Sequence, residues 1–402
     1  MAAPQLRFKE FDGEWNNFEL GTLGYFINGL TYAPENIVEK GLLVLRSSNV
    51  QNGELAFEDN VFVDLNVAQE KLTQKNDILI CVRNGSKSLI GKNALIKDLP
   101  CSATHGAFMT VFRSGLGEFV YQLLQTKRYY EYIYADLGAT INSINGNNLK
   151  KYKFYLPEKK EQTKIASFLS AVDEKISQLT QKHQLLSQYK QGRMQKLFSQ
   201  QIRFKADDGS EFGEWEEIQL RDVAERVTRK NKEDNQNALT ISAQMGLVNQ
   251  QDYFSKQIAS RDLSKYYLLH KGEFAYNKSY SAGYPMGAIK RLKLYEKGVV
   301  STLYICFALN DQLNANFFEQ YVESGALVPE LEKIAQEGAR NHGLLNISLQ
   351  EFFEVVILKP CLEEQTKIAN FLSAIDQKIE GVAQQIEQAK QWKKGLLQQM
   401  FV

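Results

Sequence analysis

The chain contains one segment twice, and this repeat limits the available folds more than any other feature. Residues 161–176, EQTKIASFLSAVDEKI, recur as residues 364–379, EQTKIANFLSAIDQKI, at an offset of 203 positions with thirteen of sixteen residues identical. Two shorter motifs open each half: residues 7–9 and 13–15, RFK and GEW, recur as residues 203–205 and 213–215. Such internal similarity indicates that the two halves fold as copies of one frame.

Between these matched ends the two halves diverge. The segment LLVLRSSNVQNGELAF in the first half stands against ALTISAQMGLVNQQDYF in the second. A duplicated frame that carries two different inserts suits a protein that recognises two different things in one fixed geometry. Ordinary duplication followed by drift is the alternative interpretation.

The repeated segments have the apolar spacing of long helices. In the first copy the alternating four-three rhythm runs through Ile165, Leu169, Val172, Ile176 and Leu179, and in the second copy through Ile368, Leu372, Ile375, Ile379, Val382, Ile386, Ala389, Lys393, Leu396 and Met400. This heptad seam predicts two coiled-coil helices of about 40 residues and about 60 Å, which can pair antiparallel as a spacer. Two amphipathic helices, each packed on its own domain, are the alternative.

The first copy departs from this rhythm in its second part. Polar residues occupy the seam at His183, Lys190 and Arg193, so the seam is expected to shift toward Leu185 and Tyr189. A further group of aromatic residues falls just beside the seam, where it can pack at the edge or contact another protein: Phe168, Tyr189, Phe371 and Trp392.

The regions between the repeats are predicted to be mixed α/β (α+β) domains. Short runs rich in β-branched and aromatic residues, such as DILICVRN and STLYICFAL, alternate with polar turns, and helices are expected at residues 118–134 and 314–336. The predicted organisation is a first domain at 1–156, a central helix at 157–200, a second domain at 201–358 and a C-terminal helix at 359–402.

Composition bounds the class of protein. The 402 residues carry 48 basic and 47 acidic side chains, so any binding to nucleic acid must come from local patches. No apolar run is long enough to span a membrane, and the four scattered cysteines are expected to be buried free thiols, which together indicate a soluble cytoplasmic protein. The sequence has no H-E-x-x-H, G-x-S-x-G or paired C-x-x-C motif, and no Pro-Pro dipeptide, so no catalytic or metal site is predicted.

Polar loops of the two variable regions carry residue types that read DNA. Arginine and lysine bond to guanine edges, asparagine and glutamine bond to adenine, and serine holds phosphates. Most Asn-Gly-Ser segments are only turns, which remains the alternative for each loop. The candidates are Arg46, Ser48, Asn49, Arg83, Asn84, Ser86, Lys87 and Asn142 in the first half, and Ser242, Gln244, Asn277, Lys278, Tyr280, Arg340 and Asn341 in the second.

The order of these features resembles the specificity subunits of type I restriction-modification enzymes. The resemblance rests on the two EQTKIA-FLSA helices and on the phrases RFKADDGSEFGEWEEIQL and GARNHGLLNISL, and it covers essentially the whole chain. It implies two target-recognition domains, each reading half of a split site in double-stranded DNA, separated by a central antiparallel helix pair. Because the second helix stops at Val402, the N-terminal residues up to Leu20 are expected to close the frame.

The resemblance also implies partners. These are adenine methyltransferase subunits, expected to be two, and restriction subunits that translocate and cleave DNA. S-adenosylmethionine, ATP and Mg would then be bound by those subunits, and none by this chain, which would be non-catalytic. The candidate residues for contact with partners or within the spacer are Gln162, Ile165, Phe168, Leu169, Gln365, Ile368, Phe371 and Leu372.

Two other functions are consistent with parts of the sequence. A coiled-coil scaffold whose two domains bind proteins or glycans would explain the near-neutral charge. A specificity subunit of a type IIB-like enzyme would keep the DNA target and change the partners.

Overall fold

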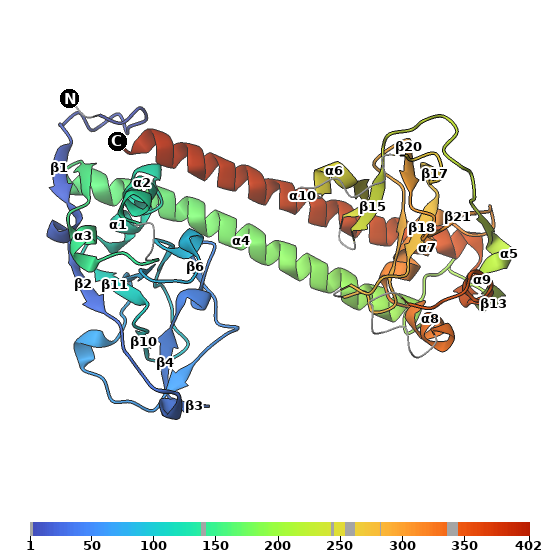
Figure 1. The fold of residues 1–402 in the computed structure, drawn as a ribbon, viewed down its shortest axis with the longest axis horizontal. Helices are drawn as coiled ribbons and strands as arrows, with labels where there is room; N and C mark the ends of the chain where they lie inside the picture. Colours follow the sequence, from blue (N-terminus) through green and yellow to red (C-terminus); the bar gives the residue numbers. More distant parts are fainter. Residues whose placement is uncertain (1–2, 138–141, 243–244, 254–261, 282, 336–344) are drawn as a thin grey trace. The chain divides into compact units, whose positions relative to one another are not determined.

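A computed structural model describes residues 3–137, 142–242, 245–253, 262–281, 283–335 and 345–402. The chain divides into two compact units, of which the first is built from two stretches of the chain and the second from one. Unit 1 comprises Met1–Gln181 together with Ala383–Val402, and unit 2 comprises Lys182–Val382. Figure 1 shows the helices and strands of both units.

Unit 1 contains two four-stranded sheets and two short strand pairs. The first sheet has the order β2 (Tyr25–Asn28), β11 (Met109–Arg113), β8 (Ile78–Cys81), β9 (Asn93–Leu95), with every pair antiparallel. The second has the order β10 (Ala103–His105), β4 (Leu42–Leu45), β7 (Phe62–Val63), β3 (Ile37–Val38), in which β10 and β4 are parallel. The pairs are β1 (Asn16–Glu19) with β12 (Lys153–Leu156), and β5 (Val50–Gln51) with β6 (Glu54–Leu55).

Unit 2 has one four-stranded sheet, which repeats the strand order of the first sheet of unit 1, and three strand pairs. Its four-stranded sheet has the order β14 (Ala224–Arg226), β21 (Ile305–Leu309), β18 (Phe274–Asn277), β19 (Ala288–Arg291). Its strand pairs are β13 (Glu216–Gln219) with β22 (Val356–Lys359), β15 (Leu239–Ser242) with β16 (Gly246–Asn249), and β17 (Tyr267–His270) with β20 (Lys297–Val300). The same strand order in two different sequences confirms that the chain is a duplicated mixed α/β frame.

Short helices surround the sheets. In unit 1 they are α1 (Gly117–Leu123), α2 (Lys127–Asp136), α3 (Gly146–Lys150) and the 3-10 turns η1 (Leu20–Thr22), η2 (Pro34–Asn36), η3 (Ser47–Asn49), η4 (Gln69–Lys71) and η5 (Lys87–Leu89). In unit 2 they are α5 (Leu220–Val223), α6 (Gln250–Tyr253), α7 (Ala315–Glu323), α8 (Val328–Ile334) and α9 (Leu349–Glu354).

Each helix predicted at the end of a variable region is in fact two. In unit 1 the helix is interrupted before Thr126. The hydroxyl of Thr126 accepts a hydrogen bond from the Tyr129 N–H and so caps the start of α2. In unit 2 α7 ends at Glu323, and the break before α8 contains Gly325, whose positive φ of 83° favours glycine.

The two repeated segments form the predicted long helices, α4 (Lys159–Phe198) and α10 (Leu362–Met400). In the core of unit 1, Ile165 and Leu169 of α4 pack in one cluster with Leu396 and Met400 of α10. In the core of unit 2, Leu197 of α4 packs in one cluster with residues from the start of α10. The beginning of each helix therefore lies beside the end of the other, which is an antiparallel pair (Figure 1).

The expected shift of the seam in α4 was wrong. Leu185 and Tyr189 are 57% and 45% exposed, whereas His183 and Lys190 are less exposed and continue the original spacing. The periodicity is kept because Lys190 has a partner: its ammonium lies 2.6 Å from the Asp376 carboxylate of α10. The expectation of buried thiols was also wrong for two of the four cysteines, since Cys101 and Cys361 are exposed.

Two polar contacts occur once in each unit at equivalent repeat positions. The guanidinium of Arg7 bonds both oxygens of the buried Glu161 carboxylate at 2.8 and 2.7 Å, and Arg203 does the same to Glu364 at 3.1 and 2.7 Å. These hydrogen bonds raise the pKa of both arginines. Each pair attaches an opening motif to the start of a long helix, where an anionic side chain also matches the helix dipole.

The second repeated contact joins the two long helices to each domain. In unit 1 the Lys393 ammonium lies 2.5 Å from the Asp173 carboxylate, which also accepts a 2.8 Å hydrogen bond from the Gln122 amide. In unit 2 the Lys190–Asp376 pair is completed in the same way by a 2.8 Å hydrogen bond from Gln320.

Candidate nucleic-acid interface

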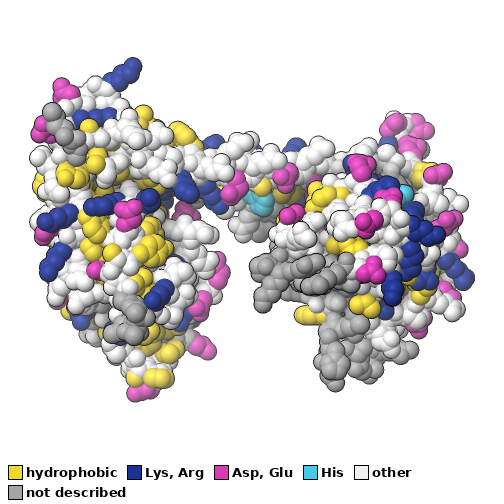
Figure 2. Space-filling model, turned by 45° about the horizontal axis from the view of Figure 1, so that its top comes forward, with side chains coloured by type: hydrophobic (Ala, Val, Ile, Leu, Met, Phe, Trp, Pro, Cys, Tyr) yellow, Lys and Arg dark blue, Asp and Glu magenta, His cyan; other side chains and the backbone are white. Residues whose placement is uncertain are grey.

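Charge is distributed in local patches. Figure 2 shows that the Lys and Arg side chains on the drawn face of each unit lie in separate patches interrupted by acidic side chains. Among the described residues, no group of three or more His, Cys, Asp or Glu side chains is placed to hold a metal ion. None of the helices in that part of the chain combines the length and apolar character needed to cross a bilayer.

Part of the predicted DNA-contact residues lies at one hairpin connection in each unit. Residues 82–92 join β8 to β9 in unit 1, and residues 278–287 join the equivalent strands β18 and β19 in unit 2. Each connection ends in a glycine with positive φ, Gly91 at 84° and Gly287 at 75°, where any Cβ atom would lie within 3 Å of a neighbour. The frame therefore presents two equivalent loops with different side chains.

Several predicted residues of unit 1 lie together at this loop. The Asn84 amide donates to the Ser47 hydroxyl at 3.0 Å, and this bond joins the loop to η3 beside Ser48. The Asn142 amide donates to the Gly85 carbonyl at 2.9 Å from a third segment. Ser86 and Lys87 are exposed on the same loop. Sequence positions almost 100 residues apart thus form one polar surface.

An aromatic side chain that the sequence analysis missed belongs to this surface. Phe108 is 57% exposed, and the Arg83 guanidinium lies over its ring at 5.7 Å from the centroid. In the major groove arginine bonds to guanine edges and phenylalanine contacts the methyl group of thymine, so both residue types can contact bases. The sequence gives no local signal for Phe108, because its neighbours form an ordinary apolar strand.

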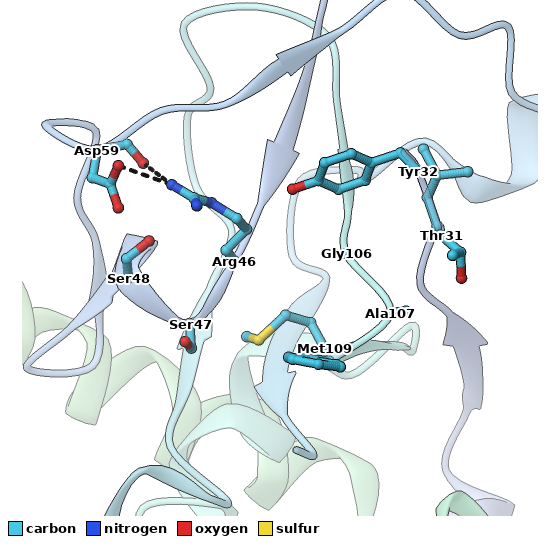
Figure 3. Close-up of a pocket in the computed structure, with 11 residues that line it drawn as sticks. Thr31, Tyr32, Arg46, Ser47, Ser48, Asp59, Gly106, Ala107 and Met109 are labelled. Carbon is cyan, nitrogen blue, oxygen red and sulfur yellow. Dashed lines mark hydrogen bonds and ion pairs between the residues drawn. The ribbon is translucent and has the colours of Figure 1, made fainter. Parts of the chain in front are cut away.

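Arg46 lies in a cavity of about 510 Å³ in unit 1, at the end of β4. Figure 3 shows its guanidinium turned toward Asp59, with Tyr32 on the opposite side of the cavity. Arg46 Nη2 lies 2.9 Å from the Asp59 carboxylate and donates to the Asp59 carbonyl at 3.0 Å. The neighbouring Ser48 hydroxyl and the charge of Arg46 hold the pKa of the Asp59 carboxyl below its usual range.

The structure corrects the assignment of Asn49 as a residue exposed for DNA contact. Its side chain is fully buried, accepts from the Arg46 backbone N–H at 2.9 Å and donates to the Ala56 carbonyl at 2.9 Å. Asn49 therefore holds the loop that carries Arg46, and a base cannot reach it while that loop keeps its conformation.

The predicted residues of unit 2 are less closely grouped. Tyr280 is 64% exposed on the 278–287 loop, and Lys278 on the same loop donates to the Ile347 carbonyl at 3.0 Å. Asn277 at the end of β18 accepts from the Ser279 N–H at 3.1 Å. Ser242 is buried and accepts from the Met245 N–H, so it supports the turn after β15. Gln244, Arg340 and Asn341 lie outside the described residues.

The residues predicted for partner or spacer contacts on the helices are mostly in the cores. Ile165, Leu169, Ile368 and Leu372 are buried in their units. Gln162 and Gln365 are also buried, and each donates to a proline carbonyl five residues earlier, Pro157 or Pro360, which fixes the start of its helix. They are therefore unavailable to another protein in this conformation.

Phe168 and Phe371 are the two helix candidates that stay partly exposed. Each ring contacts the phenylalanine of an opening motif, Phe8 at 5.7 Å and Phe204 at 5.6 Å between centroids. In unit 1, Trp392 of α10 adds an edge contact to Phe168 at 6.1 Å. The aromatic residues beside the seam thus attach the opening motifs to the helices and leave part of their surface uncovered.

Comparison with known proteins finds specificity subunits of type I restriction enzymes among the relatives. The chain is 30% identical to the Type I restriction enzyme EcoKI specificity subunit of Escherichia coli K12 over 190 residues, 44% of this chain and 41% of that protein. It is 29% identical to the Putative type I restriction enzyme MjaX specificity subunit of Methanocaldococcus jannaschii over 228 residues, 52% and 53% of the two chains. These alignments span about half the length of the curated relatives.

A solved structure and a family profile cover more of the chain. The crystal structure of the Type-I restriction-modification system S subunit from M. genitalium has the same fold, with a TM-score of 0.61 at 18% identity over 100% of this chain and 99% of that one. The profile described as Type I restriction modification DNA specificity domain matches residues 12–188 and 213–391, one match for each copy of the frame. The chain belongs to the family of type I restriction-modification DNA specificity proteins.

Proposed function

We propose that this chain recognises a two-part site in double-stranded DNA and directs partner subunits to it. Each unit reads one half of the site, and the α4–α10 pair sets the gap between the halves. The first unit would use the surface that includes Arg46, Arg83, Asn84 and Asn142, and the second would use the 278–287 loop.

One observation carries this proposal above the others. The two units share a strand order and both repeated polar contacts, yet their equivalent loops, 82–92 and 278–287, carry different side chains. A duplicated frame with unlike reading loops is what a protein needs to recognise two different half-sites. A general scaffold has no such need for two unlike loops on one frame.

The partners follow from the same duplication. Because the opening motif and the start of a long helix occur twice, the chain offers two equivalent surfaces, which suits two adenine methyltransferase subunits. Restriction subunits that translocate and cleave DNA complete the complex. We assign S-adenosylmethionine, ATP and Mg to these subunits, and this chain would supply only recognition.

An exchange of domains tests the proposal. Replacing residues 20–156 with the equivalent region of a relative, in cells that supply the methyltransferase subunits, changes one half of the methylated site and leaves the other half and the gap unchanged. The exchange of residues 220–358 is the matched control and changes the opposite half. Methylome sequencing measures both. If either exchange altered both halves, one unit would not read one half-site, and methylation independent of the chain would refute the proposal altogether.

A further inference from the structure

The cavity at Arg46 has the donors and acceptors of a base-pair reader. We propose that Arg46 and Asp59 together read one G·C base pair in the major groove of the half-site bound by unit 1. Arg46 would donate to the guanine and Asp59 would accept from the amino group of the cytosine. This inference rests on the proposed function and assigns that function to two named side chains.

The guanidinium is held in place before DNA arrives. Its Nη2 group forms an ion pair with the Asp59 carboxylate and donates a hydrogen bond to the Asp59 backbone carbonyl. Its Nε atom is enclosed and has no acceptor in the protein. The described contacts of the guanidinium thus leave Nη1 available for an acceptor in the cavity. A fixed arginine loses little side-chain entropy on binding, which favours specific contact between Nη1 and one acceptor atom of guanine, O6 or N7.

The carboxylate argues for a base and against a phosphate. Asp59 is 65% exposed, and its carboxyl is ionised at neutral pH because the ordinary pKa of aspartate is about 3.9. A DNA phosphate placed on Arg46 would lie close to this negative charge, and the repulsion would weaken the contact. The N4 amino group of cytosine is a hydrogen-bond donor, and carboxylates accept from it. The Arg–Asp pair therefore matches the acceptor and donor pattern that a G·C pair presents in the major groove.

The remaining walls of the cavity are suited to a base edge. Phe108 and Met109 form an apolar side, and Tyr32 lies across from Arg46 (Figure 3). The volume of about 510 Å³ leaves room for a base edge to enter between them. The cavity thus combines one fixed cation, one exposed anion and an aromatic wall, all within unit 1.

The conformation of the loop does not depend on the Arg46 side chain, so substitutions at Arg46 test the side chain alone. Asn49 holds the loop through the backbone N–H of Arg46, so Arg46→Ala and Arg46→Lys leave that bond intact. Arg128→Ala is the matched control, because Arg128 is an exposed arginine on α2 that does not line the cavity. Thermal unfolding and far-UV circular dichroism verify that each variant is folded.

The experiment measures methylation by the full complex of this chain with its methyltransferase subunits, on duplexes that differ at each position of the site. With the parent chain, one half-site contains a required G·C pair. Arg46→Ala reduces discrimination at that pair by about 5-fold, the lower end of the range for a bidentate base contact, because only Nη1 remains available to the guanine. Arg46→Lys reduces it as well, since lysine keeps the charge and loses the planar fork. Asp59→Asn reduces discrimination at the same pair, and Arg128→Ala leaves discrimination unchanged at every position.

Other results would overturn the inference. A uniform loss of methylation at every position with Arg46→Ala, rescued by Arg46→Lys, would identify a phosphate contact. Unchanged discrimination in all variants, or a parent site in which neither half requires a G·C pair, would exclude the base contact while leaving the proposed function in place. A parent complex whose methylation shows no dependence on this chain would refute both.

Discussion

The Lys393–Asp173 ion pair offers a sharp test of how the long helices are held together. Its two side chains are only 13% and 17% exposed, so water solvates and screens the two charges only weakly, and each charge is stabilised mainly by the other. The equivalent pair in unit 2, Lys190–Asp376, is 17% and 42% exposed. The same substitution at the two repeat positions therefore compares one contact in two different solvent environments.

Asp173→Asn removes the carboxylate and keeps the size of the side chain. It leaves the Lys393 ammonium unpaired at a mostly buried site, where breaking an ion pair costs about 3–5 kcal/mol. Asp376→Asn removes a half-exposed charge, and we expect a cost of roughly 1–2 kcal/mol because water screens that pair. For a unit of about 200 residues, each kcal/mol lowers Tm by about 2–4 °C.

Hydrogen exchange measured by mass spectrometry on the full chain separates the two effects. Asp173→Asn should speed exchange in residues 159–181 and 383–402, and Asp376→Asn should act weakly in residues 182–198 and 362–382. The double variant Asp173→Leu with Lys393→Met should recover most of the lost stability, because it removes both charges. Equal effects of the two single variants, or no effect of Asp173→Asn, would refute the reasoning from burial.

Three further outcomes are expected. Ile379→Asp places a carboxylate against the apolar core of unit 2 and should lower the free energy of unfolding by several kcal/mol, which a lower Tm would show. An unchanged Tm would mean that Ile379 does not belong to the seam. Inserting one heptad after both Leu179 and Val382 should lengthen the recognised gap by about three base pairs, because it adds about 10.5 Å, whereas insertion in one helix alone should lose activity; an unchanged gap would contradict the spacer role. Burial lowers the pKa of His105, whose Nε2 donates to the Ile27 carbonyl at 2.9 Å, below its ordinary value of 6.5. The unfolded chain then binds a proton that the folded chain does not, so the stability of unit 1 should fall as pH drops below about 6.5, and His105→Gln should flatten this dependence in thermal unfolding scans.

The frame was predictable because it is periodic and duplicated. Heptad spacing placed Ile165 and Ile368 in the cores, and the repeat predicted two similar units. Within the helices, the apolar character of single residues is a weaker guide than the heptad period. Leu185 and Tyr189 are exposed although they are apolar, and the polar Lys190 continues the seam. The partner of Lys190 was not predictable, because Asp376 faces it only in one antiparallel register.

The candidate site was predictable in part. Loop composition pointed to Arg46, Arg83 and Asn84, which do lie at one surface. It could not separate them from Asn49, because a buried asparagine that supports a turn and an exposed one that reads a base have the same local sequence. Asp59 and Phe108 were missed since only tertiary structure brings them to Arg46. The Arg7–Glu161 pair had a signal that was not used: both residues recur in the second half.

The placement of lysine and aspartate on the long helices also selects their orientation. Each helix carries one aspartate and, 17 positions later, one lysine, at equivalent places in the repeat. In the antiparallel arrangement each lysine meets an aspartate. If the helices lay parallel in the register of the repeat, aspartate would face aspartate and lysine would face lysine, and two repulsions would replace two attractions. Two apolar seams of the same period pack almost equally well in either direction, so these four charges disfavour the parallel alternative.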